Sequence, residues 1–244
     1  MHQLYDTIGT TYAEYRRPDP RIAAQIMTAL GDAKTIINVG AGTGSYESKD
    51  RNVVAIEPSE IMIRQRPSDA APVVRASAMQ LPFQDGTFDA ALAIFSVHHW
   101  SDQRRGLEEM ARVAARSIIL TWDQAHAGAT WLIRDYFPEI GRHGRTICPP
   151  LETYRRVFAR LEIIAVPIPH DCTDGFLNAY WRRPEAYFDA GARSAISAFA
   201  DLPELDSGLA RLRRDLDNGT WSRRNNDLLN RTELDLGYRL VVAE

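Results

Sequence analysis

The stretch that decides the fold is Ile36-Ile37-Asn38-Val39-Gly40-Ala41-Gly42-Thr43-Gly44, an apolar run that ends in three closely spaced glycines. This pattern predicts a buried strand followed by a tight loop, whose bare backbone amides can lie against a ligand. The glycines are spaced Gly-x-Gly-x-Gly, and Ser45 stands where the last glycine of the dinucleotide fingerprint would fall. The spacing therefore disfavours an NAD site.

Short apolar runs recur along the first half of the chain and predict five strands, at residues 35–39, 53–56, 72–75, 88–95 and 117–122. Residues 19–30 and 104–115 have apolar positions on one face at the helical period. Apolar strands that alternate with helices predict a parallel sheet covered on both faces. Because parallel crossovers usually need about a dozen residues, we expect a helical stub at residues 45–49.

The second half predicts a helix at 151–159, a sixth strand at 161–167 and a last, alternating strand at 234–243. Between these strands, residues 168–232 are rich in aromatic side chains and are expected to be mostly helical. The predicted fold is α/β, a doubly wound, mostly parallel seven-stranded sheet with a helical insertion between the last two strands. We expect a lid at 1–18, a core at 19–167 plus 233–244, and a substrate cap at 168–232.

The composition is that of an ordinary globular protein, with 45% hydrophobic and 25% charged residues among 244 and a net charge of −3. This balance argues against general attraction to nucleic acid or to an anionic membrane. Cys148 and Cys172 stand far apart with no metal-ligand spacing nearby, so no metal site is expected. No signal peptide or bilayer-spanning run is apparent, so we expect a cytoplasmic protein. The sequence carries no signal for an oligomeric state.

Three further motifs follow the glycine loop. The first is Val54-Ala55-Ile56-Glu57-Pro58-Ser59, in which a carboxylate at the end of the second strand can accept both hydroxyls of an adenosine ribose. The alternative for Glu57 is a solvated loop residue. The other two are Arg75-Ala76-Ser77-Ala78-Met79-Gln80-Leu81-Pro82-Phe83, after the third strand, and Phe88-Asp89-Ala90-Ala91-Leu92-Ala93-Ile94-Phe95-Ser96-Val97-His98-His99-Trp100, which contains the fourth.

These four elements, in this order and spacing, resemble the class I S-adenosylmethionine-dependent methyltransferases, and the resemblance covers roughly residues 1–123. The likeness is greatest to the group that includes the ubiquinone and menaquinone methyltransferases. It implies S-adenosylmethionine as cofactor, with its methionine end at Gly40, Ala41, Gly42 and Gly44, its ribose at Glu57 with the adjoining Pro58, its adenine at Ser77, Ala78 and Met79, and its sulfonium beside Phe95 and Ser96. Two positions depart from the family pattern, since Asn38 and Ser77 stand where the family usually has acids.

The amino terminus, Tyr5-Asp6-x-x-Gly9-x-x-Tyr12-x-x-Tyr15-Arg16-Arg17-Pro18, also resembles the family's lid over the cofactor. The resemblance implies that Tyr5, Tyr15 and Arg16 touch the methionine moiety. The alternative is a surface helix held by aromatic packing.

We expect methyl transfer to a small-molecule acceptor that lies under the aromatic-rich cap at 168–232. In-line transfer from a sulfonium depends mainly on positioning, and a general base is needed only if the acceptor must lose a proton. His98 and His99 are the best-placed candidate catalytic residues, because strand ends at the sheet's switch point line the ligand crevice. The alternatives are a dinucleotide-dependent oxidoreductase and a non-catalytic S-adenosylmethionine-binding protein.

Overall fold

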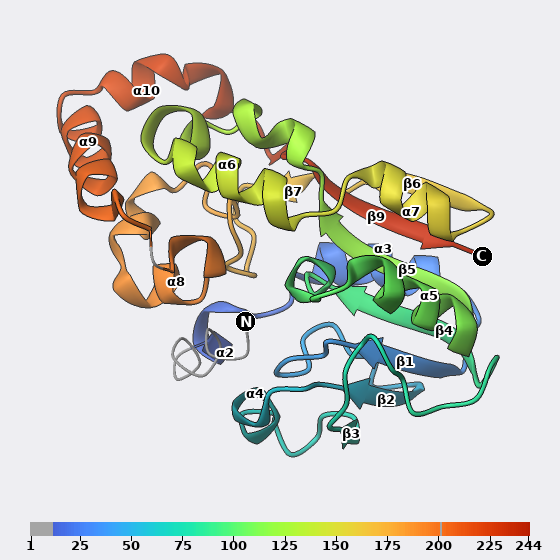
Figure 1. Ribbon diagram of the computed structural model, residues 1–244. Helices are drawn as coiled ribbons and strands as arrows, with labels where there is room; N and C mark the ends of the chain where they lie inside the picture. The colour runs from blue at the N-terminus through green and yellow to red at the C-terminus, as the bar shows by residue number, and fades with distance from the viewer. Residues whose placement is uncertain (1–11, 201) are drawn as a thin grey trace.

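The computed structural model describes residues 12–200 and 202–244. They form one seven-stranded sheet in the order β3-β2-β1-β4-β5-β9-β6 (Figure 1). All pairings are parallel except those of β9, which runs antiparallel to β5 and β6. The predicted α/β sheet is therefore confirmed. Its strands are β1 (Thr35–Val39), β2 (Asn52–Ile56), β3 (Val73–Val74), β4 (Phe88–Ile94), β5 (Ala114–Trp122), β6 (Leu161–Ala165) and β9 (Tyr238–Ala243).

Helices lie against both faces of the sheet. Those that contribute most to its two cores are α3 (Pro20–Leu30), α5 (Gln103–Val113) and α7 (Leu151–Val157). Successive side chains of a strand point to opposite faces, so each strand supplies two hydrophobic clusters. In β1, Ile36 joins the cluster that contains Ile22 of α3, whereas Ile37 joins the cluster that contains Leu107 of α5. No helix in the described ranges is long and apolar enough to cross a membrane.

The crossover from β1 to β2 corrects one prediction. Residues 45–49 do not form a helical stub but the end of a turn followed by irregular chain. Tyr46 adopts a left-handed conformation there, with φ of 63°, and its hydroxyl donates to Asp174 Oδ2 at 2.9 Å. Because the side chain of Tyr46 is buried against a distant segment, the crossover is held by tertiary contacts rather than by helical hydrogen bonds.

The predicted last strand is also corrected, because it divides into two. Gly237, with φ of 86°, separates β8 (Glu233–Leu234) from β9. The short β8 leaves the main sheet and pairs with β7 (Ile168–Pro169). This small ribbon joins the core to the segment that follows β6.

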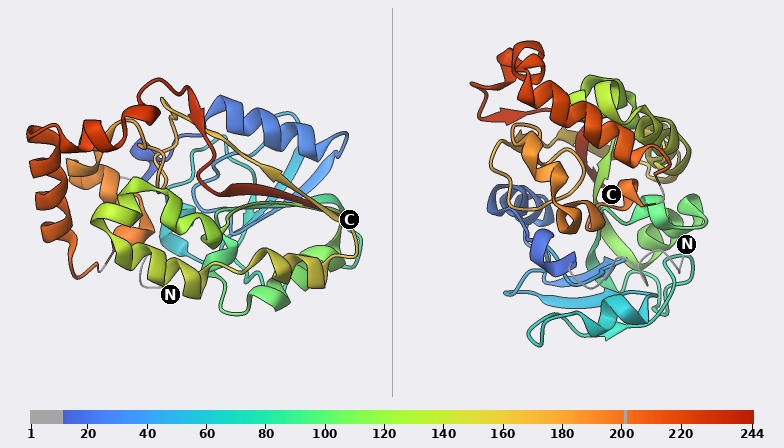
Figure 2. Two further views of the ribbon diagram at one scale, coloured as in Figure 1. Left: turned by 90° about the horizontal axis from the view of Figure 1, so that it is seen from above. Right: turned by 90° about the vertical axis from the view of Figure 1, so that its left-hand side faces the viewer.

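A cap lies beyond the carboxyl ends of the central strands (Figures 1 and 2). Residues 170–183 form loops and turns, so residues 168–232 are less helical than predicted. Residues 124–147, between β5 and α7, contribute to the same hydrophobic cluster. The cap helices are η3 (Gln124–Ala129), η4 (Leu132–Tyr136), α6 (Pro138–Ile147), η5 (Pro184–Phe188), α8 (Ala190–Ser194), η6 (Ser197–Phe199), α9 (Leu205–Asp217), α10 (Thr220–Arg224) and η7 (Asn226–Leu228).

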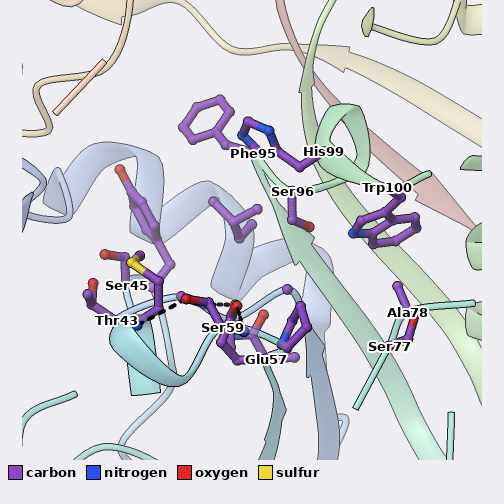
Figure 3. Close-up of a pocket in the computed structure, with 18 of the residues that line it drawn as sticks. Thr43, Ser45, Glu57, Ser59, Ser77, Ala78, Phe95, Ser96, His99 and Trp100 are labelled. Carbon is purple, nitrogen blue, oxygen red and sulfur yellow. Dashed lines mark hydrogen bonds between the residues drawn. The ribbon is translucent and has the colours of Figure 1, made fainter. Parts of the chain in front are cut away.

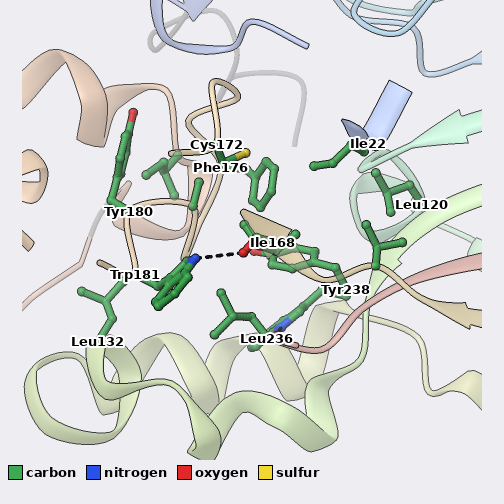
Figure 4. Packing of buried hydrophobic residues seen from close by; sticks show 14 of the residues in the cluster. Ile22, Leu120, Leu132, Ile168, Cys172, Phe176, Tyr180, Trp181, Leu236 and Tyr238 are labelled. Atoms are coloured by element: carbon green, nitrogen blue, oxygen red, sulfur yellow. Dashed lines mark hydrogen bonds between the residues drawn. The ribbon is translucent and has the colours of Figure 1, made fainter. Parts of the chain in front are cut away.

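Most aromatic residues of the cap form its own core. Trp131 makes edge-to-face contacts with the rings of Tyr136, Tyr187 and Trp221, at centroid distances of 5.3–5.9 Å. Its indole nitrogen donates to the carbonyl of Trp181 at 2.8 Å. The indole of Trp181 in turn donates to the carbonyl of Ile168 at 3.0 Å (Figure 4). The cap is therefore a packed unit that is pinned to the β7 ribbon.

The packing of α5 can be tested at Gly106, which lies beneath the loop that follows β4. We call this loop, residues 95–102, the strand-four loop. A Cβ at this position would collide with the ring of Trp100, whereas a Cβ at Gly128 would meet nothing within 4 Å. Alanine is favoured over glycine inside a helix by about 1 kcal/mol. We nevertheless expect Gly106→Ala to lower the free energy of unfolding by about 1–3 kcal/mol because of overpacking. Gly128→Ala is the control in urea denaturation, and equal midpoints for the two variants would contradict the packing described.

Candidate functional site

A cavity of about 340 Å³ opens where β1, β2 and β4 end. Strand ends at the switch point of an open α/β sheet are the usual place for a ligand crevice, and this volume lies within the usual range of ligand pockets. Figure 3 shows Thr43, Ser45 and Glu57 on one side of the cavity and Phe95, Ser96 and His99 on the other. We call it the cofactor cavity, after the ligand that the sequence analysis predicts for these residues. Its walls come from five segments of the chain, at residues 12–16, 38–46, 57–62, 77–79 and 94–101.

The glycine loop lies close to the strand-four loop. A Cβ at Gly40 would lie 2.6 Å from Cβ of Ser96, and the Ser96 hydroxyl donates to the carbonyl of Val39 at 2.9 Å. Gly40 and Gly42 both have positive φ, at 72° and 52°. A side chain would strain the backbone at both positions, and at Gly40 it would also occupy the space between the two loops.

Glu57 connects the glycine loop to the turn after β2. Its Oε2 accepts from the backbone amide of Gly42 and its Oε1 from that of Ser59, each at 2.8 Å (Figure 3). The residue is 7% exposed and lines the cavity. A carboxylate accepts up to about four hydrogen bonds, two on each oxygen, and is a suitable acceptor for hydroxyl groups of a ligand. Sequence reasoning did not reveal the contact with Gly42.

A buried ion pair braces the same loop. Glu47 and Arg66 have side chains 3% and 4% exposed, and Arg66 Nη2 lies 2.8 Å from Glu47 Oε1. Arg66 also donates to the carbonyl of Gly42 at 3.1 Å, and Asn38 donates its side-chain amide to Glu47 at 3.1 Å. Asn38 lines the cavity, whereas Glu47 lies behind it and holds the side-chain amide of Asn38 in place.

Most of the predicted cofactor-binding residues line this cavity. They are Arg16, Gly40, Ala41, Gly42, Glu57, Pro58, Ser77, Ala78, Met79, Phe95 and Ser96. Gly44 and Tyr15 do not line it, and the hydroxyl of Tyr15 instead donates to Asp189 of the cap at 2.9 Å. Tyr5 lies outside the described residues. The prediction omitted several lining residues, namely Tyr12, Asn38, Thr43, Ser45, Tyr46, Ser59, Met62, Ile94, Trp100 and Ser101.

A second cavity of about 230 Å³ adjoins the first and lies under the cap. We call it the acceptor cavity, after the predicted place of the acceptor under the cap. His98, Trp122, His143 and Phe176 are among its lining residues, whereas Tyr12, Arg16, Phe95 and His99 line both cavities. These four form a septum between the two spaces. Of the aromatic residues in 168–232, Phe176 alone lines either cavity.

Phe95 sits in the septum with a strained backbone. It has φ of 51°, and its ring contacts those of Phe176 and Tyr238 at 5.0 and 5.6 Å between centroids. A bulky residue in the left-handed region costs about 1–3 kcal/mol and persists only where its surroundings enforce it. These ring contacts hold the side chain of Phe95 between the two cavities.

Arg16 joins the septum to the cap. Its Nε lies 2.6 Å from Oδ1 of Asp174, and its Nη1 donates to the hydroxyl of Tyr12 at 2.8 Å. Burial by itself would lower the pKa of Arg16, but the neighbouring Asp174 raises it above the ordinary value. The guanidinium therefore stays charged.

Two histidines of η2 (Val97–His99) lie beside each other, His98 on the wall of the acceptor cavity and His99 in the septum. Their rings are 3.9 Å apart between centroids. Burial, and secondarily Arg16 and His143, lower the pKa of His98 to about 4. Burial, His98 and Arg16 likewise lower the pKa of His99 well below its ordinary value. Both imidazoles are therefore neutral near pH 7.

Comparison with known proteins agrees with this arrangement. Residues 37–119 match the family model described as a methyltransferase domain. A crystal structure from Anabaena variabilis, of a protein assigned as a methyltransferase from an antibiotic biosynthesis pathway, superposes with a TM-score of 0.88. It is 32% identical, over 95% of this chain and 100% of that one.

Curated relatives match over shorter stretches. The demethylmenaquinone methyltransferase of Corynebacterium urealyticum is 31% identical over 121 residues, which are 45% of this chain and 53% of that protein. The tRNA (carboxymethyluridine(34)-5-O)-methyltransferase of Schizosaccharomyces pombe is 26% identical over 114 residues, covering 46% of this chain and 50% of that protein. The chain thus matches about half the length of these curated relatives.

The chain belongs to the class I S-adenosylmethionine-dependent methyltransferases. The predicted family and its cofactor are confirmed.

The contribution of the buried Glu47–Arg66 ion pair can be tested by comparing Arg66 with Arg64, an exposed arginine on the same segment. Arg64 is 74% exposed and pairs with Glu60 at the surface, whereas Arg66 is buried. Arg66→Gln leaves Glu47 as a buried charge without its cation, so we expect it to cost about 3–5 kcal/mol of unfolding free energy. Arg64→Gln should cost less than about 1 kcal/mol, as for exposed pairs. Urea denaturation measures both changes. Similar losses of unfolding free energy in the two variants would contradict a stabilising role for the Glu47–Arg66 ion pair.

Proposed function

We propose that this protein transfers a methyl group from S-adenosylmethionine to a small-molecule acceptor. The observation that carries the proposal is the pair of adjacent cavities that share the septum of Tyr12, Arg16, Phe95 and His99. A reaction between two bound molecules needs their reacting atoms about 3–3.5 Å apart in line. Two cavities separated by a single layer of side chains can supply that proximity.

The cofactor cavity has features suited to the cofactor. The close approach of Gly40 to Ser96 leaves backbone at the cavity wall where a side chain would stand. Glu57 offers a buried carboxylate for the ribose hydroxyls, and Ser77, Ala78 and Met79 line the place proposed for adenine. We assign the methionine end to Gly40, Ala41 and Gly42. The sulfonium would supply an activated methyl group beside Phe95 and Ser96.

Small size is proposed for the acceptor because its cavity is narrow and covered. The acceptor cavity has about 230 Å³, and residues of α6, α8 and η6 line its cap side. The net charge of −3 provides no general attraction for a polyanion. The tRNA methyltransferase of S. pombe and the demethylmenaquinone methyltransferase of C. urealyticum match similar shares of this chain, 46% and 45%, so these matches do not decide between the two kinds of acceptor. We therefore favour a small molecule over RNA.

The chain's own residues position the reactants in this proposal. Phe95 and Tyr238 would exclude water from the septum by their ring packing. His98 and His99 would hydrogen-bond the acceptor as neutral rings. We propose to keep the division of the chain into a lid at 1–18, a core and a cap at 168–232. Residues 124–147 are added to the cap.

Glu57→Gln tests the cofactor site. The amide has only one acceptor oxygen and turns an N–H toward the backbone amide of Gly42 or Ser59. Loss of charge-assisted hydrogen bonds to the ribose should weaken S-adenosylhomocysteine binding by about 10–100-fold, equivalent to roughly 1.5–3 kcal/mol. Isothermal calorimetry measures this effect, and Glu60→Gln on the exposed face of α4 (Glu60–Arg64) is the control.

The same calorimetry should show no NAD binding to the unmodified protein. Binding of NAD, with no response to S-adenosylmethionine or S-adenosylhomocysteine, would reject the proposed function in favour of an oxidoreductase.

A further inference from the structure

One wall of the cofactor cavity is a stretch of chain without regular secondary structure. No helix or strand lies between β3 and β4, and residues 77–79 of this stretch line the cavity. We call residues 77–83 the base segment, after the adenine proposed to bind there. Figure 3 shows Ser77 and Ala78 on the same side of the cavity as Trp100. Because the backbone groups of this segment cannot pair along a helix or strand, they need other partners once they are buried.

A four-residue turn begins the base segment. The amide of Gln80 donates to the carbonyl of Ser77 at 3.2 Å, and the amide of Met79 donates to the Ser77 hydroxyl oxygen at 3.3 Å. The turn leaves out the amide of Ala78, which donates to no residue in the part of the chain that the structure describes. Ala78 is 6% exposed, and buried amides are nearly always paired. The Ala78 amide is therefore available to an acceptor atom on a ligand.

Two charged side chains of α5 supply partners for the rest of the base segment. Glu109 Oε2 accepts from the amide of Leu81 at 2.8 Å. Arg112 donates to the carbonyls of Leu81 and Phe83, at 3.1 and 2.8 Å. Both backbone groups of Leu81 are thus bonded to α5. The end of the turn is therefore fixed to a helix rather than left to find its own conformation.

These two side chains also bind each other. Arg112 Nη2 and Nε each lie 2.8 Å from an oxygen of Glu109, whose side chain is 3% exposed. The hydrogen bonds from Arg112 lower the pKa of Glu109 below its ordinary value, so the carboxylate is charged near pH 7. A buried charge is tolerated only when it is paired and hydrogen-bonded. Arg105, which lies 3.2 Å from Glu109 Oε1, extends the contact to the carbonyl of Met79 at 3.3 Å.

The same helix supports this wall through apolar contacts. Ala78, Leu81 and Trp100 belong to one hydrophobic cluster with Leu107 and Met110 of α5. The base segment is therefore held against α5 by polar contacts of its backbone and by apolar contacts of its side chains.

We infer that Glu109 and Arg112 are positioning residues that set the selectivity of the cofactor cavity for adenine among purine bases. This inference rests on the proposed function and concerns its cofactor site. Neither residue lines the cavity. They act through the backbone of the base segment, which they hold so that the Ala78 amide meets the base.

The selectivity follows from the edge that each base presents. Adenine has an acceptor at N1, whereas hypoxanthine carries a hydrogen there. A fixed backbone donor pairs with the first and is left without a hydrogen bond by the second. A donor that can move aside loses this discrimination, so the selectivity depends on how firmly α5 holds the base segment.

The experiment compares S-adenosylhomocysteine with S-inosylhomocysteine, which has hypoxanthine in place of adenine. Both are titrated into the full chain by calorimetry. We expect the unmodified protein to bind S-adenosylhomocysteine at least about tenfold more tightly. Glu109→Gln should lower this ratio to about threefold or less. Glutamine has the same shape, but its NH2 group would face the donor of either Leu81 or Arg112, whichever way it turned.

A conservative variant and a matched control accompany it. Arg112→Lys keeps a positive charge beside Glu109, but a single ammonium group lacks the planar fork that reaches the carboxylate and two carbonyls together. We expect its ratio to lie between those of the unmodified protein and of Glu109→Gln. The control is Glu108→Gln, because Glu108 is 40% exposed and pairs with Arg104 on the same helix. Its ratio should equal that of the unmodified protein.

Two results would overturn the inference. One is equal binding of the two compounds by the unmodified protein. The other is a Glu109→Gln variant that weakens both by the same factor, which is the result of a role in stability alone. If Glu109→Gln does not fold, the ratio in Arg112→Lys decides, since an unchanged ratio there contradicts the inference. Failure of the proposed function is distinguishable, because the unmodified protein would then bind no S-adenosylhomocysteine, and the inference would fall with it.

Discussion

The buried carboxylate of Asp174 is the interaction on which the arrangement of the two cavities depends. It belongs to the cap, yet its partners are Arg16 of the amino-terminal segment and Tyr46 of the crossover after the glycine loop. A buried charge is tolerated only when it is paired and hydrogen-bonded. These contacts therefore fix three segments, far apart in the sequence, against one another. The septum exists because Arg16 is held at their meeting point.

A second constraint acts within the cofactor cavity. The glycine loop must lie close to the strand-four loop, and its carbonyl and amide groups need partners once they are buried. Glu57 accepts from the amide of Gly42 while Arg66 donates to its carbonyl. The loop is thus held from both sides before any ligand binds, and such preorganisation reduces the free energy that ordering would cost on binding.

The sheet could be predicted from the sequence because its strands are short, apolar and separated by helices of clear period. The stretch around Gly40 and Glu57 also predicted which edge carries the site. Contacts between residues distant in sequence could not be predicted. The sequence contains no local pattern for the hydrogen bond between Tyr46 and Asp174, or for that between Asn38 and Glu47. Both depend on how the turns after the glycine loop fold. Likewise, nothing in residues 124–147 indicated that they would pack with the cap.

The most direct test of the account is a crystal structure of the protein with S-adenosylhomocysteine. The account predicts ribose hydroxyls at hydrogen-bond distance from Glu57, adenine beside Ser77 to Met79, and the sulfur at the septum, with its open side toward the acceptor cavity. A ligand bound elsewhere, or a sulfur atom turned away from Phe95 and His99, would contradict it.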